Sequence, residues 1–118
     1  GVNLSGGQKQ RLTIARAIIR RSSLVMLDDS LSAVDGSTER AITNELREDS
    51  DTRTVVLVSH RLATLKHADR IVVMNRGRIE AIGAHEELIA TCKTYRRINE
   101  LQTSAAQDTH PVDVGVHA

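Results

Sequence analysis

Two adjacent carboxylates, Asp28 and Asp29, follow the apolar residues 24–27. Neighbouring negative charges repel each other, so this pair indicates that a cation or a ligand binds close by. A histidine, His60, follows a second apolar run over residues 54–58. Mg²⁺ prefers carboxylate oxygens and usually brings phosphate groups with it. We therefore expect a site for Mg²⁺ and a phosphate-bearing ligand, although Asp29 is also compatible with a simpler role as a solvated turn residue or helix cap.

A second candidate site lies at the start of a helical pattern, in the segment Ser5-Gly6-Gly7-Gln8. The free N–H groups and the positive dipole end of a helix N-terminus attract anions. Two glycines allow the backbone to approach a phosphate closely, and Ser5 and Gln8 add side-chain donors. The simpler interpretation is a serine cap on a helix that follows a flexible loop. Both interpretations remain open at this point, because Ser-Gly-Gly is common in loops.

Two helices are needed to position these residues. The apolar spacing predicts the first over residues 8–21. It predicts a second helix that is capped by Ser37 or Thr38 and ends at about residue 47. The inward face of the first helix is expected to contain Leu12, Ala15 and Ile19, flanked by Ile14 and Ile18, and that of the second Ala41, Ile42 and Leu46.

Residues 24–27 and 54–58 predict two short strands that are buried on both faces, with Met26 in the core. Strand, helix and strand at this spacing form a βαβ unit, which implies a parallel sheet with a right-handed crossover. Ligands bind at the carboxyl ends of the strands in open parallel sheets. This topology would bring both carboxylates and the histidine to one crevice.

The rest of the chain predicts short elements that complete an α/β fold. We expect a short helix near residues 61–66, a hairpin over 70–83 that turns at Arg76-Gly77 with Met74 in its core, and helices over 84–90 and 94–101. The periodicity stops at Gln102, and residues 102–118 are expected to form a disordered tail.

The composition limits the classes of function. The chain has 118 residues, with 16 Lys and Arg against 15 Asp and Glu, so its net charge is +1. This balance gives no general attraction to nucleic acid or to an anionic membrane. The single cysteine, Cys92, excludes a disulfide within the chain. No apolar run is long enough to cross a bilayer.

Four segments in order, "LSGGQKQR" (4–11), "LVMLDD" (24–29), "SAVD" (32–35) and "VSHR" (58–61), resemble the C-terminal part of the nucleotide-binding domain of ABC transporters. They correspond to the family's signature motif, Walker B strand, D-loop and switch histidine. The likeness is greatest to exporters, in which membrane helices and ATPase domain share one chain. "GAHEEL" (83–88) resembles a further family segment, G-T-H-x-E-L, with Ala84 in place of Thr. The resemblance assigns residues 1–101 to a partial P-loop NTPase-like domain.

The resemblance implies ATP and Mg²⁺ as cofactors and gives each site residue a role. Asp28 would hold Mg²⁺, and His60 would contact the γ-phosphate and position the attacking water. The family usually has Glu at the catalytic position, where this chain has Asp29. The shorter side chain displaces the carboxylate by roughly 1 Å, which can cost roughly 10²-fold in rate. Loss of a general base costs roughly 10²- to 10⁴-fold.

The same resemblance implies a second nucleotide-binding domain as partner, identical or different. The residues that would grip the γ-phosphate of ATP held on that partner are Ser5, Gly6, Gly7 and Gln8, and Asp35 would bridge to it. The helix over residues 8–21 would lie near the coupling helices of a transmembrane domain. The protein would then act at the cytoplasmic face of an inner or plasma membrane, without nucleic acid.

Several interpretations remain. In the first, Asp29 marks an impaired site in an exporter whose signature motif serves the partner's ATP. In the second, Asp29 is a competent base in a symmetric homodimeric exporter. A soluble ABC-type ATPase of DNA repair or translation is a third, against which the balanced charge speaks. The fourth is an interaction module without nucleotide chemistry.

One departure concerns the phosphate-binding loop G-x-x-x-x-G-K-[ST], which this sequence does not contain. In the family that loop precedes the signature motif, so it would lie upstream of Gly1. We therefore expect the 118 residues alone to be inactive and unable to bind ATP usefully, and their sheet to be incomplete.

Overall fold

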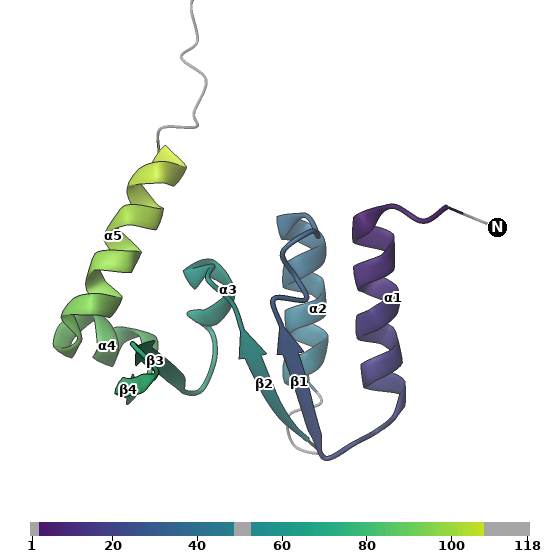
Figure 1. Ribbon diagram of the computed structural model, residues 1–118, viewed down its shortest axis with the longest axis horizontal. Helices are drawn as coiled ribbons and strands as arrows, with labels where there is room; N and C mark the ends of the chain where they lie inside the picture. The colour runs from purple at the N-terminus through teal and green to yellow at the C-terminus, as the bar shows by residue number, and fades with distance from the viewer. Residues whose placement is uncertain (1–2, 49–52, 108–118) are drawn as a thin grey trace, which may run out of the picture. The chain divides into compact units, whose positions relative to one another are not determined.

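A computed structural model of the chain describes residues 3–48 and 53–107. The chain divides into two units, Gly1–Leu65 and Lys66–Ala118, which are described separately below. Unit 1 has the order α1 (Gly6–Ile19), β1 (Leu24–Asp28), α2 (Gly36–Glu48), β2 (Thr54–Val58) and α3 (Leu62–Leu65), and unit 2 has β3 (Ile71–Asn75), β4 (Arg78–Gly83), α4 (His85–Thr91) and α5 (Lys93–Gln107), as labelled in Figure 1. No helix within these described ranges is long and apolar enough to cross a membrane.

Unit 1 contains the predicted βαβ arrangement. Strands β1 and β2 pair in parallel, with Leu24 opposite Thr54 and Asp28 opposite Val58. Helix α2 connects them, and α1 and α2 cover one face of the pair (Figure 1). The buried core consists of Ile14, Val25, Leu27, Leu31, Val34 and Leu46. The parallel pair therefore ends at one edge with Asp28 and Val58 side by side.

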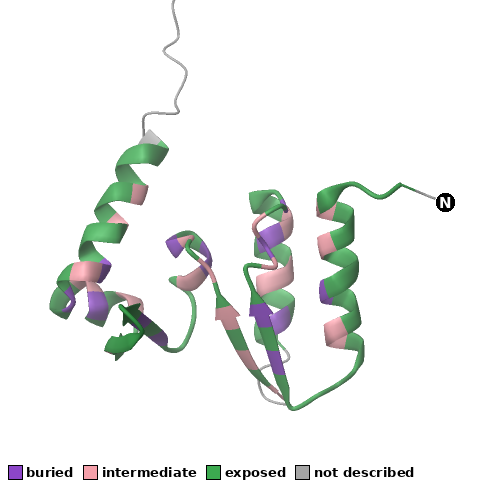
Figure 2. Ribbon diagram, viewed as in Figure 1, coloured by how far each residue is buried: buried purple, intermediate pink, exposed green. Residues whose placement is uncertain are grey.

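The strands are buried on one face only, which corrects the prediction that both of their faces are covered. Along β1, Val25 and Leu27 are buried, whereas Leu24 and Met26 are 50% and 66% exposed (Figure 2). Val56 and Val58 of β2 are exposed as well. Successive side chains of a strand point to opposite faces, and the described helices of unit 1 cover only one of these faces. The expectation that Met26 lies in the core is therefore wrong.

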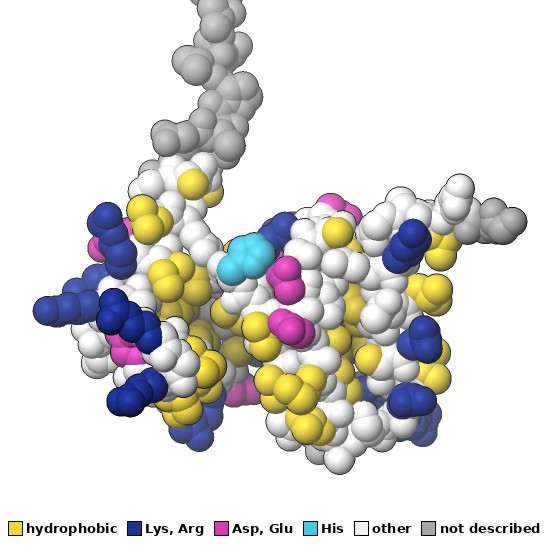
Figure 3. All heavy atoms as spheres, in the orientation of Figure 1, with side chains coloured by type: hydrophobic (Ala, Val, Ile, Leu, Met, Phe, Trp, Pro, Cys, Tyr) yellow, Lys and Arg dark blue, Asp and Glu magenta, His cyan; other side chains and the backbone are white. Residues whose placement is uncertain are grey.

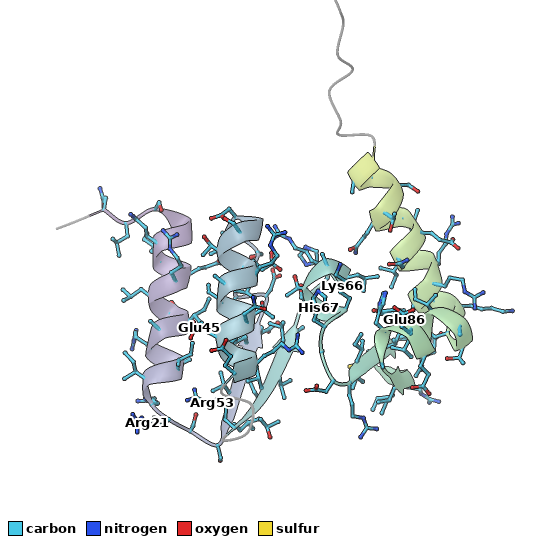
Figure 4. All side chains as sticks on the ribbon, turned by 180° about the vertical axis from the view of Figure 1, so that it is seen from behind. Arg21, Glu45, Arg53, Lys66, His67 and Glu86 are labelled. Atoms are coloured by element: carbon cyan, nitrogen blue, oxygen red, sulfur yellow. The ribbon has the colours of Figure 1, made fainter. Side chains whose placement is uncertain are left out.

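Helix α1 packs through a different face from the predicted one. Ile14 is buried and Ile18 packs against the core, whereas Leu12 and Ile19 are 54% and 77% exposed. Ala15 and Ile19 instead line a groove of about 440 Å³ between α1 and α2. Figure 4 shows Glu45 of α2 beside this groove. Apolar residues occur around much of this helix, so their spacing alone did not determine which of them would meet β1.

Helix α2 starts earlier than predicted because Asp35, and not Ser37 or Thr38, caps it. Its side-chain Oδ1 accepts hydrogen bonds from the backbone N–H groups of Ser37 and Thr38. As predicted, Leu46 is buried and Ile42 packs against the core, but Ala41 is exposed. The helix continues to Glu48, one residue beyond the expected end.

Unit 2 begins with the predicted hairpin. Strands β3 and β4 are antiparallel, with Asn75 opposite Arg78. The two turn residues, Arg76 and Gly77, have φ angles of 49° and 75°. Positive φ at both central residues is typical of a type I′ turn, whose twist matches that of the strands. Met74 is 64% exposed, so the expectation that it belongs to the hairpin core is wrong, because its side chain points to the uncovered face.

Helices α4 and α5 pack against this hairpin. Among residues 66–106, the buried side chains are Ile71, Val73, Leu88, Cys92 and Tyr95. Tyr95 OH lies 2.9 Å from Nδ1 of His85. Helix α5 continues to Gln107, whereas the sequence pattern predicted an end near Leu101 and a tail from Gln102. The rest of the predicted tail, residues 108–118, lies outside the described residues, and the domain boundary at residue 101 stays a prediction.

Candidate functional site

The end of β1 turns sharply at the second of the two carboxylates. The Asp29 N–H donates to the carbonyl oxygen of Val58 at 2.9 Å, which extends the strand pairing by one residue. Asp29 has φ of 46°, in the left-handed region. Asp and Asn tolerate this region better than other residues that have a Cβ. The backbone at this position therefore suits the aspartate and directs the chain away from the strand.

His60 and Asp29 meet where the two strands end. His60 Nδ1 lies 3.4 Å from Asp29 Oδ1, with 73% and 52% of the two side chains exposed. Figure 3 shows acidic side chains beside a histidine on this surface. A proton on Nδ1 would be directed toward the carboxylate, which leaves the lone pair on Nε2. The arrangement supplies an oriented imidazole and a carboxylate at the carboxyl end of a parallel sheet, where such sheets bind ligands.

Asp28 is the adjacent candidate for a metal ligand. It is the last residue of β1 and is exposed. Within the described part of the chain, no three His, Cys, Asp or Glu side chains gather as ligands for a metal ion. Mg²⁺ keeps several waters and commonly binds through one or two carboxylates plus substrate phosphates. The single exposed carboxylate of Asp28 would fit that mode of binding, in which waters and phosphates supply the other ligands.

The first turn of α1 contains the serine cap that the sequence pattern allowed. Gln8 N–H donates to Ser5 Oγ at 3.2 Å, and Ser5 N–H donates to Gln8 Oε1 at 2.9 Å. This reciprocal pair is a capping box, which explains why the helix begins at Gly6. The Ser5 hydroxyl hydrogen and the Gln8 amide hydrogens take no part in the box. The cap is therefore present, and both side chains keep donors for an anion.

The two glycines differ in their surroundings. A Cβ at Gly6 would meet nothing within 4 Å, so this position is open. A Cβ at Gly7 would lie 3.1 Å from the carbonyl oxygen of Ala33. Gly7 therefore allows α1 to approach the loop that follows β1, a structural reason that the sequence pattern did not indicate.

Sequence reasoning missed Gln10, which joins α1 to the same loop. Ala33 N–H donates to Gln10 Oε1 at 2.9 Å, and Gln10 Nε2 donates to Ser32 Oγ at 3.3 Å. Gln10 is partly buried, although it lies among exposed polar residues of the helix. A polar residue next to the motif was the only available signal. The loop between Asp29 and Asp35 is thus attached to α1.

Asp35 is engaged within its own chain. Its carboxylate accepts from Ser37 Oγ at 2.5 Å, Thr38 Oγ1 at 2.7 Å and Thr38 N–H at 2.9 Å. These hydrogen bonds, that from the Ser37 hydroxyl first, hold the pKa of Asp35 well below its usual range. The residue is a helix cap in this structure and lies away from the interior.

Comparison with known proteins shows which family the chain resembles. Residues 1–32 match the family model described as ABC transporter. The chain is 50% identical, over 86% of its length, to an uncharacterized ABC transporter ATP-binding protein, YknU, of Bacillus subtilis. It is 44% identical, over 88% of its length, to the ATP-dependent lipid A-core flippase of Pasteurella multocida.

A solved structure agrees in fold as well as in sequence. A bacterial Atm1-family ABC exporter with ATP bound superposes with a TM-score of 0.81 and 34% identity, over 85% of this chain and 18% of that one. The chain spans only 17% and 18% of the two relatives named above.

The chain is therefore similar in sequence and in fold to part of the ATP-binding domain of ABC transporters. Within that class the resemblance is to the ATP-binding domains of exporters, as the names of the flippase and of the solved structure indicate. This confirms both the family resemblance and the α/β fold class expected from the motifs.

Proposed function

We propose that these residues are part of the ATP-binding and ATP-hydrolysing domain of an ABC exporter. In the complete protein, this domain would couple ATP binding and hydrolysis to the transport of a substrate across a membrane. The observation that best supports the proposal is the 3.4 Å contact between His60 Nδ1 and Asp29 Oδ1 at the carboxyl ends of two parallel strands. The similarity to a flippase and to an exporter with bound ATP supports the same function.

Three side chains have different roles in the proposed site. Asp28 holds Mg²⁺, which neutralises charge on the phosphates when it is bound. Asp29 accepts a hydrogen bond from the attacking water, and His60 contacts the γ-phosphate. All three lie at or just beyond the strand ends, and all three are exposed. They are therefore accessible to a ligand that arrives from solvent.

A second nucleotide-binding domain is the proposed partner. The exposed side chains of Ser5 and Gln8 and the open position at Gly6 form a surface that a γ-phosphate held on the partner could approach. Gly7 allows this turn to lie against the Ala33 carbonyl. Asp35 would contact the partner only through lone pairs that its four intrachain hydrogen bonds leave available. The proposed assembly also includes a transmembrane domain. Its coupling helices would lie near α1 at the cytoplasmic face of the membrane.

The proposal includes an impaired site in this chain. Asp29 is one methylene shorter than glutamate, and its left-handed backbone fixes where the short side chain begins. The signature residues would then serve ATP in a more active partner site. The contact with His60 favours a second candidate, a symmetric exporter in which Asp29 is a competent base.

ATP turnover by the complete protein, purified without any other subunit, distinguishes these candidates. An impaired site predicts low turnover that rises on the order of 10²-fold in Asp29→Glu. Asp29→Asn, which keeps the shape but removes the charge, should lower the turnover further. High turnover in the wild type with little change in Asp29→Glu would instead establish the symmetric exporter. Turnover that is unaffected by Asp29→Asn and by His60→Ala would contradict both candidates.

A further inference from the structure

Among the described residues of unit 1, one carboxylate is buried and has no role in any of the motifs. Glu39 lies in the first turn of α2 and is only 7% exposed. A buried charge is costly unless it is paired and hydrogen-bonded. Glu39 Oε2 accepts from Arg61 at 2.9 Å, and Glu39 Oε1 accepts from Thr64 Oγ1. The pair therefore joins α2 to the segment that follows β2.

Arg61 makes a second contact with a different part of the unit. Its other terminal nitrogen donates to the carbonyl oxygen of Ser32 at 2.9 Å, while its backbone N–H donates to Ser59 Oγ at 3.0 Å. The planar guanidinium presents several donors in a fixed fork, so one side chain can hold two acceptors in a defined geometry. Arg61 directly follows His60 in the chain. Its side chain thus links this segment to α2 and to the loop after β1.

The loop after β1 is held from its other side as well. Gln10 of α1 binds Ala33 N–H at 2.9 Å, next to the carbonyl that Arg61 binds. This loop begins at Asp29. One hydrogen bond attaches it to α1, and another attaches it to the segment that contains His60. Asp29 and His60 are themselves largely exposed, so burial contributes little to the distance between them.

We infer that Arg61, held by Glu39, is a positioning residue that sets the place of His60 relative to Asp29. This inference rests on the function proposed above, because it assigns Arg61 a role in the turnover of ATP. The guanidinium of Arg61 binds Glu39 and the carbonyl oxygen of Ser32. It acts by fixing the turn that includes His60 against the loop that includes Asp29.

The test compares Arg61→Lys with the control Arg40→Lys in the complete protein. Lysine keeps the charge and can still reach one acceptor, but it lacks the fork that spans Glu39 and Ser32. Arg40 is the exposed neighbour of Glu39 on α2. A displacement of about 1 Å can cost roughly 10²-fold in rate, so we expect kcat to fall roughly 10- to 100-fold in Arg61→Lys. KM for Mg-ATP should change less than about twofold, since substrate binding is not the affected step. Arg40→Lys should match the wild type.

Hydrogen exchange provides a readout that does not depend on activity. We expect faster exchange of the backbone amides of residues 59–64 in Arg61→Lys and in Glu39→Gln, but not in Arg40→Lys. Unchanged exchange in Arg61→Lys would overturn the inference whether or not the protein hydrolyses ATP. A lower kcat that is accompanied by a lower melting temperature and a raised KM would also overturn it, because this combination indicates a general structural role. A wild-type protein without any ATP turnover would overturn the proposed function alone, and the exchange result would still decide the inference.

Discussion

His60 Nδ1 lies 3.4 Å from Asp29 Oδ1, although the two residues come from different strand ends. The parallel register explains this contact, because Asp28 and Val58 are direct partners and each candidate residue follows one of them closely. The Asp29 N–H bond to the Val58 carbonyl then fixes the first turn beyond the sheet. The register of the parallel pair thus places a carboxylate and an imidazole at the same end of the sheet.

The two glycines of the first turn of α1 should respond differently to alanine. Alanine favours a helix over glycine by roughly 0.5–1 kcal/mol. Gly6→Ala has open space and should gain thermal stability, whereas Gly7→Ala would place its Cβ 3.1 Å from the Ala33 oxygen and should lose this gain or become destabilised. Thermal unfolding of the complete protein measures the difference. Equal gains in both variants would contradict the close approach of α1 to the loop.

Asp35 should make the stability of unit 1 depend on acid pH. Its folded pKa is lowered, mainly by the Ser37 hydroxyl, so the stabilisation is complete above the unfolded pKa of roughly 3.9. The stabilisation is lost as the pH falls through the folded pKa, because the proton then displaces these hydrogen bonds. We expect Asp35→Asn to be less stable than the wild type at pH 7 and the difference to shrink as the pH is lowered toward 3.

The control for that experiment is Glu45→Gln, which removes an exposed carboxylate from the same helix. The measurement is the difference in melting temperature between each variant and the wild type at each pH. A difference for Asp35→Asn that stays constant with pH would exclude the capping carboxylate as its source.

The hairpin turn of unit 2 should be improved by substitution at Arg76. A residue with a Cβ in the left-handed region costs roughly 1–2 kcal/mol, and Arg76 has φ of 49°. Asparagine tolerates this region, and Asn-Gly is a favoured pair for such turns. Arg76→Asn should therefore raise the free energy of unfolding by up to about 1 kcal/mol. Gly77→Ala, at φ of 75°, is the opposite control and should lower it.

Denaturant titration of the complete protein would measure both hairpin variants. A stabilisation by Gly77→Ala, or a loss with Arg76→Asn, would show that the turn does not have these backbone angles.

Tyr95 should make unit 2 sensitive to alkaline pH. Burial, followed by the nearby charge of Glu86, raises the pKa of Tyr95 above its usual value of 10. A raised folded pKa gives stabilisation that is present below the unfolded pKa and lost as the pH rises through the folded pKa. The wild type should therefore lose stability above about pH 10.

Tyr95→Phe removes the titrating group and also the hydrogen bond to His85 at 2.9 Å. It should be less stable than the wild type at pH 7 by about 1 kcal/mol, and its stability should depend less on pH above 10. Unfolding followed between pH 7 and 11 tests both statements. An unchanged alkaline slope would contradict the assignment to Tyr95.

The sequence by itself determined the local elements and the order of the motifs. Short apolar runs and the positions of Gly and Asp are local signals, so they correctly predicted two parallel strands, the crossover helix and the turn at Arg76-Gly77. They also predicted that Asp29 and His60 would share one edge of the sheet. These features depend on backbone preferences and on the chirality of the crossover, which neighbouring residues specify.

Only the tertiary structure decided which surfaces are covered and which side chains hold the loops. Ile14 faces the core, whereas Leu12 does not, because the register of α1 on β1 depends on contacts with distant residues. The contacts of Arg61 with Glu39 and Ser32 likewise join segments that are far apart in the sequence. Such pairings leave no periodic pattern in the chain. The sequence specifies each element through its neighbouring residues. The pairings between elements depend instead on close packing, which exists only once the chain is folded.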